Sequence, residues 1–414
     1  MGANGSGTVA IVGGGLVGSL LASFLTRRGY EVTVHERRSD PRDTSVDQGR
    51  SINLVLTRRG ARALERVGLA GRAYELTVPV TGRMVHDLDG ERTYQPYGRD
   101  RTECNYSISR AALNRYLIDA AESLGARFRF GMRLVSADLD GGHLTFDDTA
   151  TGTTVEVPAR RIVGADGAGS VLREAFEEID GFEQSTELLS HGYKELLLPA
   201  TPDGQYPIEA HALHIWPRGS LMLMALANVG GSFTGTLYLP VEGSDGFESL
   251  TTPERVETLF GAQFPDAIPL IPDLTGEFFE NPTGRLGTVR CGPWHHRDRA
   301  FLIGDAAHAI VPFFGQGMNS GFEDCRVLDD LLDRFGDDAW DQVLPEFTRS
   351  RKPDADAIAA MAIDNFEEMR DRVGDRRFLL RKAVEHRLEE AAPHEYRSRY
   401  SLVMYSHVRF DLCR

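Results

Sequence analysis

The sequence has few cysteines and no long apolar run. Its four cysteines, Cys104, Cys291, Cys325 and Cys413, are scattered and form no C-x-x-C pair. This spacing predicts neither a disulfide framework nor a zinc site, and it is compatible with a reducing, cytoplasmic location. No apolar stretch approaches the roughly 20 residues that span a bilayer, and the opening MGANGSGTV lacks the features of a signal peptide. We therefore expect a soluble protein with no membrane span.

Basic residues are outnumbered by acidic ones. The sequence contains 46 Lys and Arg residues and 61 Asp and Glu residues, which gives a formal net charge of −15. Such an excess argues against nucleic acid or an acidic membrane as a partner, although it allows a local basic pocket. The sequence also lacks the H-x-x-x-H spacing, the H-E-x-x-H motif and the G-x-S-x-G nucleophile elbow. We thus expect no bound metal and no catalytic side chain, so that a cofactor would carry any chemistry.

The first forty residues contain a glycine-rich turn between two short apolar segments. Residues 8–12 predict a strand, Gly13, Gly15 and Gly18 form G-x-G-x-x-G, and the following helix leads to a second strand that ends in Glu36. The first glycine permits the turn, the second admits a pyrophosphate, and the third lets helix and strand pack closely, while the acid can accept from ribose hydroxyls. A dinucleotide site is the favoured interpretation, and a glycine turn without a ligand is the alternative.

A second motif, residues 304–320 (GDAAHAIVPFFGQGMNS), indicates which dinucleotide is bound. Asp305 follows an apolar strand at residues 300–303, and Gly315 and Gly317 open a helix. An acid can accept from ribityl hydroxyls, and a helix N-terminus favours the negative charge of a reduced flavin ring. Asp166, in VGADGA, ends another predicted strand in the same manner. These acids favour FAD over NAD(P) as the bound cofactor.

A possible anion clamp lies outside the nucleotide motifs. Arg83 interrupts an apolar strand, GRMVH, and Tyr97 follows in QPYG. A guanidinium offers two parallel donors to a carboxylate, and a phenol can add a third. We expect this pair to bind a carboxylate of the substrate.

The order of these segments predicts an α/β (α+β) fold in three parts. A Rossmann-like FAD-binding domain would comprise residues 1–75, 101–180 and 290–335. An antiparallel β-sheet substrate domain, residues 76–100 and 181–289, would be inserted into it, because residues 192–238 are rich in strand formers. Residues 336–414 would form a C-terminal helical region that closes the substrate pocket.

Several motifs taken together resemble one family. They are GGGLVGS, GRSINL (residues 49–54), SISRAALN, VGADGA, LHIWPR (213–218), FPDAIPLI (264–271) and GDAAHAIVPFFGQGMN. The combination is similar to the kynurenine 3-monooxygenase family, FAD-dependent aromatic hydroxylases of the para-hydroxybenzoate hydroxylase fold group. LHIWPR, FPDAIPLI and PFFGQGMN are the most particular to that family, and the resemblance extends from Val9 to about Phe410.

The resemblance implies roles for individual residues. The cofactor-binding positions would include Val17, Glu36, Arg38, Val55, Arg110, Leu134, Asp166, Asp305, Met318 and Asn319. The substrate carboxylate and amino group would contact Arg83, Tyr97, Asn365 and Tyr400, in agreement with the clamp deduced above. Phe313, Phe314 and Ile215 are candidates for an apolar wall that excludes water, and they could equally be ordinary core residues.

The resemblance also implies a reaction. NADPH would reduce FAD, O2 would add to form a C4a-hydroperoxyflavin, and L-kynurenine would be converted to 3-hydroxykynurenine by a monomer or homodimer. One alternative is a flavin hydroxylase acting on another aromatic amino acid, such as a substituted kynurenine. A flavoprotein that does not hydroxylate is a second alternative. Because no apolar tail is present, the soluble bacterial enzymes are the better comparison than the membrane-anchored eukaryotic ones.

Overall fold

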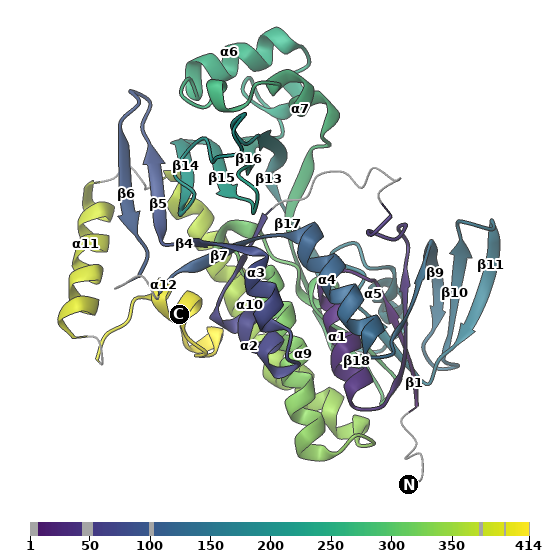
Figure 1. The fold of residues 1–414 in the computed structure, drawn as a ribbon. Helices are drawn as coiled ribbons and strands as arrows, with labels where there is room; N and C mark the ends of the chain where they lie inside the picture. The colour runs from purple at the N-terminus through teal and green to yellow at the C-terminus, as the bar shows by residue number, and fades with distance from the viewer. Residues whose placement is uncertain (1–6, 44–52, 99–102, 372–375, 393–394, 414) are drawn as a thin grey trace.

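The computed structural model describes residues 7–43, 53–98, 103–371, 376–392 and 395–413. Residues 49–52 of the GRSINL motif lie outside this part. Its strands form four sheets, around which the helices are arranged (Figure 1). The mixed α/β class expected from the sequence is confirmed.

The N-terminal glycine motif belongs to a six-stranded sheet with the order β18-β19-β12-β1-β2-β8. Its strands are β1 (Thr8–Val12), β2 (Glu31–Glu36), β8 (Arg127–Phe130), β12 (Arg161–Gly164), β18 (His295–His296) and β19 (Ala300–Leu302). All pairings in it are parallel except that of β18 with β19. The loops that follow β1, β12 and β19 therefore meet at one edge of the sheet, where parallel α/β sheets bind ligands.

Helices cover this sheet and begin at the same edge. They include α1 (Leu16–Arg27), α4 (Arg110–Ser123), α5 (Val171–Ala175), α8 (Asp305–His308) and α9 (Gly317–Phe335). Helix α2 (Arg58–Arg66) packs beside α9, and α3 (Ala70–Glu75) packs beside α2. The buried core here is continuous from β1 to the C-terminal half of α9.

A second large sheet has seven strands in the order β17-β13-β16-β15-β14-β5-β6. They are β5 (Gly82–His86), β6 (Arg92–Pro96), β13 (Glu183–Leu198), β14 (Ala212–Arg218), β15 (Leu221–Ala227), β16 (Phe233–Pro240) and β17 (Gly284–Gly292). Strand β5 runs parallel to β14 and antiparallel to the edge strand β6. This is the inserted, largely antiparallel sheet that the sequence predicted.

The two faces of this sheet have different neighbours. The upper helices α6 (Pro253–Gln263) and α7 (Leu274–Glu280) stand over the strands in Figure 1. Their residues share a buried cluster with Trp216 and Phe233. Ile215 and Tyr238 belong instead to a cluster with residues of the C-terminal helices. We call the first the back face and the second the front face.

Two smaller sheets complete the strands. One consists of β9 (Met132–Asp138), β10 (His143–Asp148) and β11 (Thr153–Pro158). The other has the order β3-β7-β4, formed by β3 (Asn53–Leu56), β7 (Asn105–Ser109) and β4 (Thr77–Val80). Strand β4 was expected in the substrate domain, whereas its partner β7 was expected in the FAD-binding domain. The β3-β7-β4 sheet therefore joins the two expected domains.

The C-terminal region is helical, as expected. Helix α10 (Trp340–Asp371) continues through Pro345 and Pro353. A proline removes one helical hydrogen bond, but the buried side chains of Trp340 and Phe347 hold the first half of α10 in the core. Further elements are α11 (Arg376–Ala391), α12 (Arg399–Tyr405) and the short helices η1 (Phe176–Glu178), η2 (Phe247–Ser249), η3 (Ile268–Leu270), η4 (Pro312–Phe314) and η5 (Phe410–Leu412).

Two further expectations concern membrane spans and disulfides. Within the residues that the structure covers, no helix is both long and apolar enough to cross a membrane. The four cysteines are unpaired and buried. The expectation of no disulfide framework thus agrees with their positions in separate parts of the fold.

Candidate functional site

The glycine turn after β1 has the geometry that a pyrophosphate requires. Gly13 adopts φ +105°, and a Cβ atom there would lie 2.4 Å from the carbonyl oxygen of Ala165. A Cβ at Gly18 would lie 2.0 Å from the carbonyl oxygen of Gly13, so that only glycine lets helix and strand approach. A Cβ at Gly15 would meet no atom within 4 Å, which leaves the backbone there open to a ligand.

Glu36 reaches this turn from the end of β2. Its Oε2 accepts a 2.7 Å hydrogen bond from the backbone N–H of Gly14, and its Oε1 accepts one of 2.9 Å from Arg38. Each carboxylate oxygen keeps a lone pair for a further donor. The position suits the ribose hydroxyls predicted from the sequence, while the Arg38 side chain is exposed.

One cavity connects the glycine turn with the front face of the seven-stranded sheet. It holds about 1310 Å³ of empty space, its open mouth included. Seven predicted cofactor residues line it: Gly15, Val17, Val55, Arg110, Asp305, Gly317 and Met318. Leu213, Met224, Thr236 and Tyr238 of the large sheet line it as well. A dinucleotide site and a smaller apolar pocket are therefore continuous.

Asp305 is held in this cavity by its neighbours. Gly304 adopts φ +61°, a conformation that glycine adopts without strain, and its N–H donates to Asp324 Oδ2 over 3.1 Å. The Asp305 side chain is left exposed to the cavity. After the left-handed turn at Gly315, helix α9 starts at Gly317 and presents its N-terminus to the same space.

The Asn319 side chain forms hydrogen bonds with the backbone around this turn. Its Nδ2 donates to the carbonyl oxygens of Val55 and Gly315, each over 2.8 Å, and its Oδ1 accepts from Thr57 over 3.0 Å. The side chain is completely buried. The structure thus gives Asn319 a role in joining β3 to α9, and its predicted contact with the cofactor stays a prediction.

Leu134 and Asp166 were predicted to contact the cofactor, and neither is among the residues that line the cavity. Leu134 is buried in the core, where it is opposite Phe146 in the β9–β10 pairing. Asp166 accepts from Ser170 Oγ over 2.6 Å and from the N–H of Leu172 over 3.2 Å. Burial raises the pKa of Asp166, although these hydrogen bonds oppose the rise. The structure shows Asp166 at the start of α5, and it does not place either side chain on the cavity.

The predicted clamp residues converge from three separate segments. Arg83 on β5 is half-buried, and its Cζ lies 5.7 Å from the ring centroid of Tyr97. The Tyr97 ring stacks on that of Tyr400 at 5.4 Å, and Asn105 Nδ2 donates to the Tyr400 hydroxyl over 3.1 Å. Burial raises the pKa of both phenols, so that each keeps its proton for donation. Among the residues described, no acidic side chain pairs with Arg83.

This cluster borders the cavity through neighbouring residues. Leu213, which lines the cavity, is the direct partner of Arg83 in the parallel β14–β5 pairing. Phe314 stacks on Tyr400 with a centroid distance of 6.1 Å. The Arg83 guanidinium therefore lies beside the part of the cavity that the front face forms.

Two residues of the predicted apolar wall belong to η4, and the third belongs to β14. Asn365 Nδ2 donates to the Phe313 carbonyl oxygen over 2.7 Å and so ties α10 to η4. Phe313, Phe314 and Ile215 are all buried in the front-face cluster. They are not among the residues that line the cavity, and their contact with a substrate stays a prediction.

Sequence reasoning missed a buried ionic network beneath α9. Asp324 accepts from His308 Nε2 over 2.6 Å and from Arg351 Nε over 2.8 Å. Glu323 pairs with Arg351 Nη1 over 3.0 Å and with Arg59 over 2.6 Å. Burial acts to raise the pKa of Asp324, but the charges of His308 and Arg351 lower it to about 2. The available signal was an acid four residues before Leu328 on the apolar face of the predicted helix.

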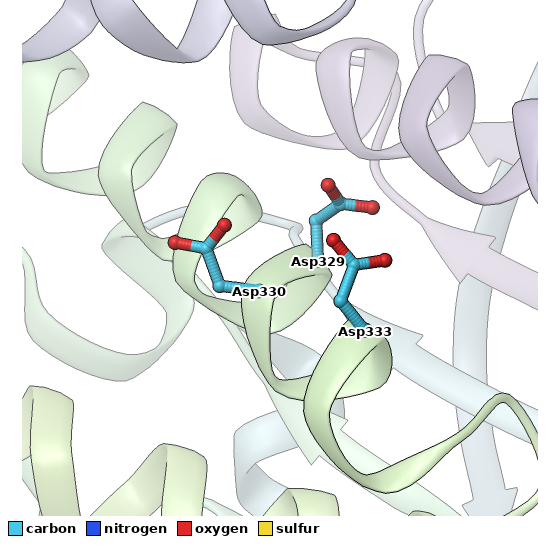
Figure 2. Close-up of side chains that lie close together, drawn as sticks. All are labelled: Asp329, Asp330 and Asp333. Atoms are coloured by element: carbon cyan, nitrogen blue, oxygen red, sulfur yellow. The ribbon is translucent and has the colours of Figure 1, made fainter.

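A group of three carboxylates also lies on α9, outside the cavity. Figure 2 shows Asp329, Asp330 and Asp333 projecting from this helix. Arg28 Nε donates to Asp329 over 2.5 Å, Arg66 Nε donates to it over 2.8 Å, and both arginines also pair with Asp333. The two guanidinium groups occupy the positions that a cation would take, so we assign the group a structural role.

The geometry of the nucleotide part fits FAD. The glycine turn has an open backbone at Gly15, the Asp305 carboxylate is exposed in the cavity, and α9 supplies unpaired N–H groups. An acid for the ribityl hydroxyls and a helix N-terminus near the ring are the features expected of a flavin site.

Comparisons with known proteins agree with this assignment. A family model of the FAD binding domain matches residues 6–362. Kynurenine 3-monooxygenase of Myxococcus xanthus (strain DK1622) is 53% identical over 406 residues, which are 98% of this chain and 87% of the relative. That of Xanthomonas axonopodis pv. citri (strain 306) is 46% identical over 405 residues, which are 98% and 89% of the two chains.

Solved structures with lower identity share the fold. A tetrameric 2-methyl-3-hydroxypyridine-5-carboxylic acid oxygenase has a TM-score of 0.72 at 22% identity, and the match covers 89% of this chain and 94% of the other. P. aeruginosa PqsL in complex with 2-aminobenzoylacetate has a TM-score of 0.70 at 21% identity, with coverages of 88% and 97%. The cavity with its glycine turn, the family model and the two close relatives lead to the same conclusion: the chain is an FAD-binding flavoprotein of the kynurenine 3-monooxygenase family.

Proposed function

We propose that this chain converts L-kynurenine, NADPH, a proton and O2 into 3-hydroxykynurenine, NADP⁺ and water. The observation that carries the proposal is the half-buried Arg83 guanidinium, which has no acidic partner among the described residues and lies next to the stacked Tyr97 and Tyr400 rings, beside a cavity that continues to the FAD-binding turn. L-Kynurenine has a carboxylate for such a clamp and an aniline ring for the apolar part of the cavity. Its two close relatives are named for the same reaction.

FAD bound in the cavity would supply the redox chemistry, with NADPH as the hydride source and O2 as the oxidant. The chain would hold it through the glycine turn, with Glu36 at the ribose and Asp305 at the ribityl chain. The N-terminus of α9 at Gly317 would stabilise negative charge on the reduced ring. No protein nucleophile is needed for this reaction.

The remaining residues would position the substrate and exclude water. Arg83, Tyr97 and Tyr400 would bind the carboxylate through charge-assisted hydrogen bonds. Asn365, whose Nδ2 donates to the Phe313 carbonyl oxygen, would contact the amino group of the substrate. The apolar lining from Leu213 and Met224 would hold the ring against FAD in a dry site, where an activated oxygen is protected from side reactions.

The decisive experiment identifies the product. The purified holoenzyme should be yellow, should oxidise NADPH faster when L-kynurenine is added, and should yield a product heavier by one oxygen atom. Mass spectrometry with ¹⁸O2 should place one labelled atom in it. NADPH oxidation with hydrogen peroxide as the sole product would contradict hydroxylation. A higher kcat/KM for a ring-substituted kynurenine than for L-kynurenine would favour the alternative substrate class.

We also propose the three-part domain division given above, with the β3-β7-β4 sheet as the junction. A cytoplasmic monomer or homodimer is our expectation for the working form. Light scattering of the holoenzyme and cell fractionation test these two points.

A further inference from the structure

Residues of two motifs to which the proposed reaction assigns no role meet on the back face of the seven-stranded sheet. LHIWPR supplies His214, Trp216 and Arg218 of β14, and FPDAIPLI supplies Asp266, which precedes η3. His86, the last residue of β5, lies between them. His86 and His214 are 2% and 1% exposed, so that their ring nitrogens depend on protein partners.

Hydrogen bonds link these side chains in one row. Asp266 Oδ2 lies 2.8 Å from His86 Nδ1, and His86 Nε2 lies 2.9 Å from His214 Nδ1. His214 Nε2 lies 2.8 Å from the carbonyl oxygen of Glu209. Trp216 Nε1 donates to both oxygens of Asp266, over 3.0 and 2.9 Å, and its ring stacks on His86 at 4.0 Å. We call Asp266, His86 and His214 the back-face row.

The chemistry of the acceptors gives the row a direction. The Glu209 carbonyl oxygen can only accept, so His214 Nε2 carries a hydrogen. Burial lowers the pKa of His214 to about 4, and the neutral ring therefore accepts at Nδ1. His86 Nε2 must then be the donor to it, and the 2.8 Å contact between His86 Nδ1 and the Asp266 carboxylate requires one further proton, which this pair shares. His86 is thus bonded on one side to β14 and on the other to the segment that carries Asp266.

These contacts tether the strand that carries Arg83. Strand β5 lies between β14 and the edge strand β6, which is largely exposed. Arg218 Nη1 donates to the His86 carbonyl oxygen over 2.9 Å and holds the same end of β5. Because side chains alternate along a strand, Arg83 points to the front face while His86 points to the back. A shift of β5 at His86 would therefore move Arg83 as well.

We propose that the back-face row fixes β5 against β14 and so places the Arg83 guanidinium for the substrate carboxylate. His86 and Asp266 are positioning residues in this proposal, which rests on the proposed function for the identity of the ligand. The row explains why a histidine, a tryptophan and an acid from two distant motifs are brought together behind the site.

The variant His86→Phe tests the proposal in the holoenzyme, because phenylalanine preserves the stacking on Trp216 and removes both hydrogen bonds. We expect KM and Kd for L-kynurenine to rise about 5- to 20-fold while kcat changes less than about twofold. Asp266→Asn, at a partly exposed side chain, should change the same quantities in the same direction and less. Met84→Leu is the matched control, since it alters the same strand without a hydrogen bond.

A double-mutant cycle separates positioning from general damage. If His86 acts through Arg83, adding His86→Phe to Arg83→Ala should change Kd by less than about twofold. The decarboxylated analogue of L-kynurenine should bind wild type and His86→Phe equally. A His86 effect of the same size in the Arg83→Ala background, or on the decarboxylated analogue, would overturn the proposal.

Hydrogen exchange gives a readout that needs no substrate. Amides of residues 82–86 should exchange faster in His86→Phe than in wild type and Met84→Leu, with β15 and β16 unchanged. Unchanged exchange in β5 would overturn the tether even if the enzyme hydroxylates L-kynurenine. Faster exchange in β5 of a protein that does not hydroxylate L-kynurenine would keep the tether and reject the proposed function.

Discussion

Arg83 is the residue on which substrate binding depends most directly. A half-buried guanidinium with no acidic partner in the described part of the chain is costly unless an anion completes it. We expect Arg83→Ala to raise KM for L-kynurenine about 10- to 100-fold, because a charge-assisted hydrogen bond contributes about 1.5–3 kcal/mol. Steady-state kinetics check this, with Arg133→Ala, an exposed arginine of β9, as control. A KM equal to that of the control would remove Arg83 from the clamp.

The lowered pKa of Asp324 predicts that the folded protein loses stability at acidic pH. Its pKa in the folded protein is about 2, below the ordinary 3.8, because the charges of His308 and Arg351 outweigh burial. A depressed pKa stabilises the fold above pH 4, and this contribution, about 2 kcal/mol, is lost as the pH falls towards 2.

Denaturant unfolding at pH 6, 4 and 2.5 measures this effect. The loss of unfolding free energy between pH 4 and 2.5 should be smaller in Asp324→Asn than in wild type. Asp330→Asn, at an exposed position of the same helix, should behave as wild type. Equal losses in all three proteins would contradict the assignment.

At the scale of single residues, the sequence predicts those whose role follows from the neighbouring residues in the chain. Gly13, Gly18 and Glu36 were identified because a turn, a helix and a strand surround them in one short segment. Asn319 was expected at the cofactor, yet its amide bonds to Val55 and Thr57, more than 260 residues earlier. Such partners depend on how distant segments pack, which no local pattern encodes.

Among the elements, the contact of α1 with α9 supports the nucleotide site. A Cβ at Gly321 of α9 would lie 2.5 Å from Cγ2 of Val17, a stiff β-branched side chain that also lines the cavity. Gly321→Ala should therefore lower the unfolding free energy by about 1–3 kcal/mol and weaken FAD binding.

A second helical glycine provides the control. A Cβ at Gly261 of α6 would meet no atom within 4 Å, so Gly261→Ala should stabilise the protein by about 0.5–1 kcal/mol. Thermal unfolding and FAD titration of the two variants test the pair. If Gly321→Ala is as stable as Gly261→Ala, the close approach of α1 and α9 is wrong.

The elements with local signals were predicted well. The βαβ opening, α9 and the strands of the inserted sheet are confirmed because their hydrophobic periodicity is regular. Helix α10 contains Pro345 and Pro353, which normally end a helix, and only the burial of Trp340 and Phe347 shows why they do not. The pairing of β4 with β7 is likewise a tertiary contact.

At the scale of the molecule, the last residues are part of the core. Phe410 of η5 is completely buried, and the Arg59 guanidinium of α2 lies 3.8 Å from its ring centroid. Phe410→Ala should lower the unfolding free energy by about 3–5 kcal/mol. Leu412→Ala, at a side chain that is 70% exposed, should change it by less than about 0.5 kcal/mol. Similar values for the two variants would show that η5 is not packed as described.

The overall architecture and the FAD site were predictable, because the glycine turn, two acids after strands and the family motifs lie in contiguous segments. The back-face row was not, although both of its motifs were noted. The row joins residues as far apart in the sequence as His86 and Asp266, and their contact depends on the order of strands in the sheet.

Because all four cysteines are buried, a thiol introduced at the surface can be labelled selectively. The turn between β5 and β6 is exposed at Asp89, and the adjacent Gly90 has open space around it. A thiol introduced by Asp89→Cys would be the readily accessible one, so a single fluorophore could be attached there under native conditions. Its emission would then report whether the hairpin that carries the carboxylate clamp moves when ligand arrives, in real time and without turnover.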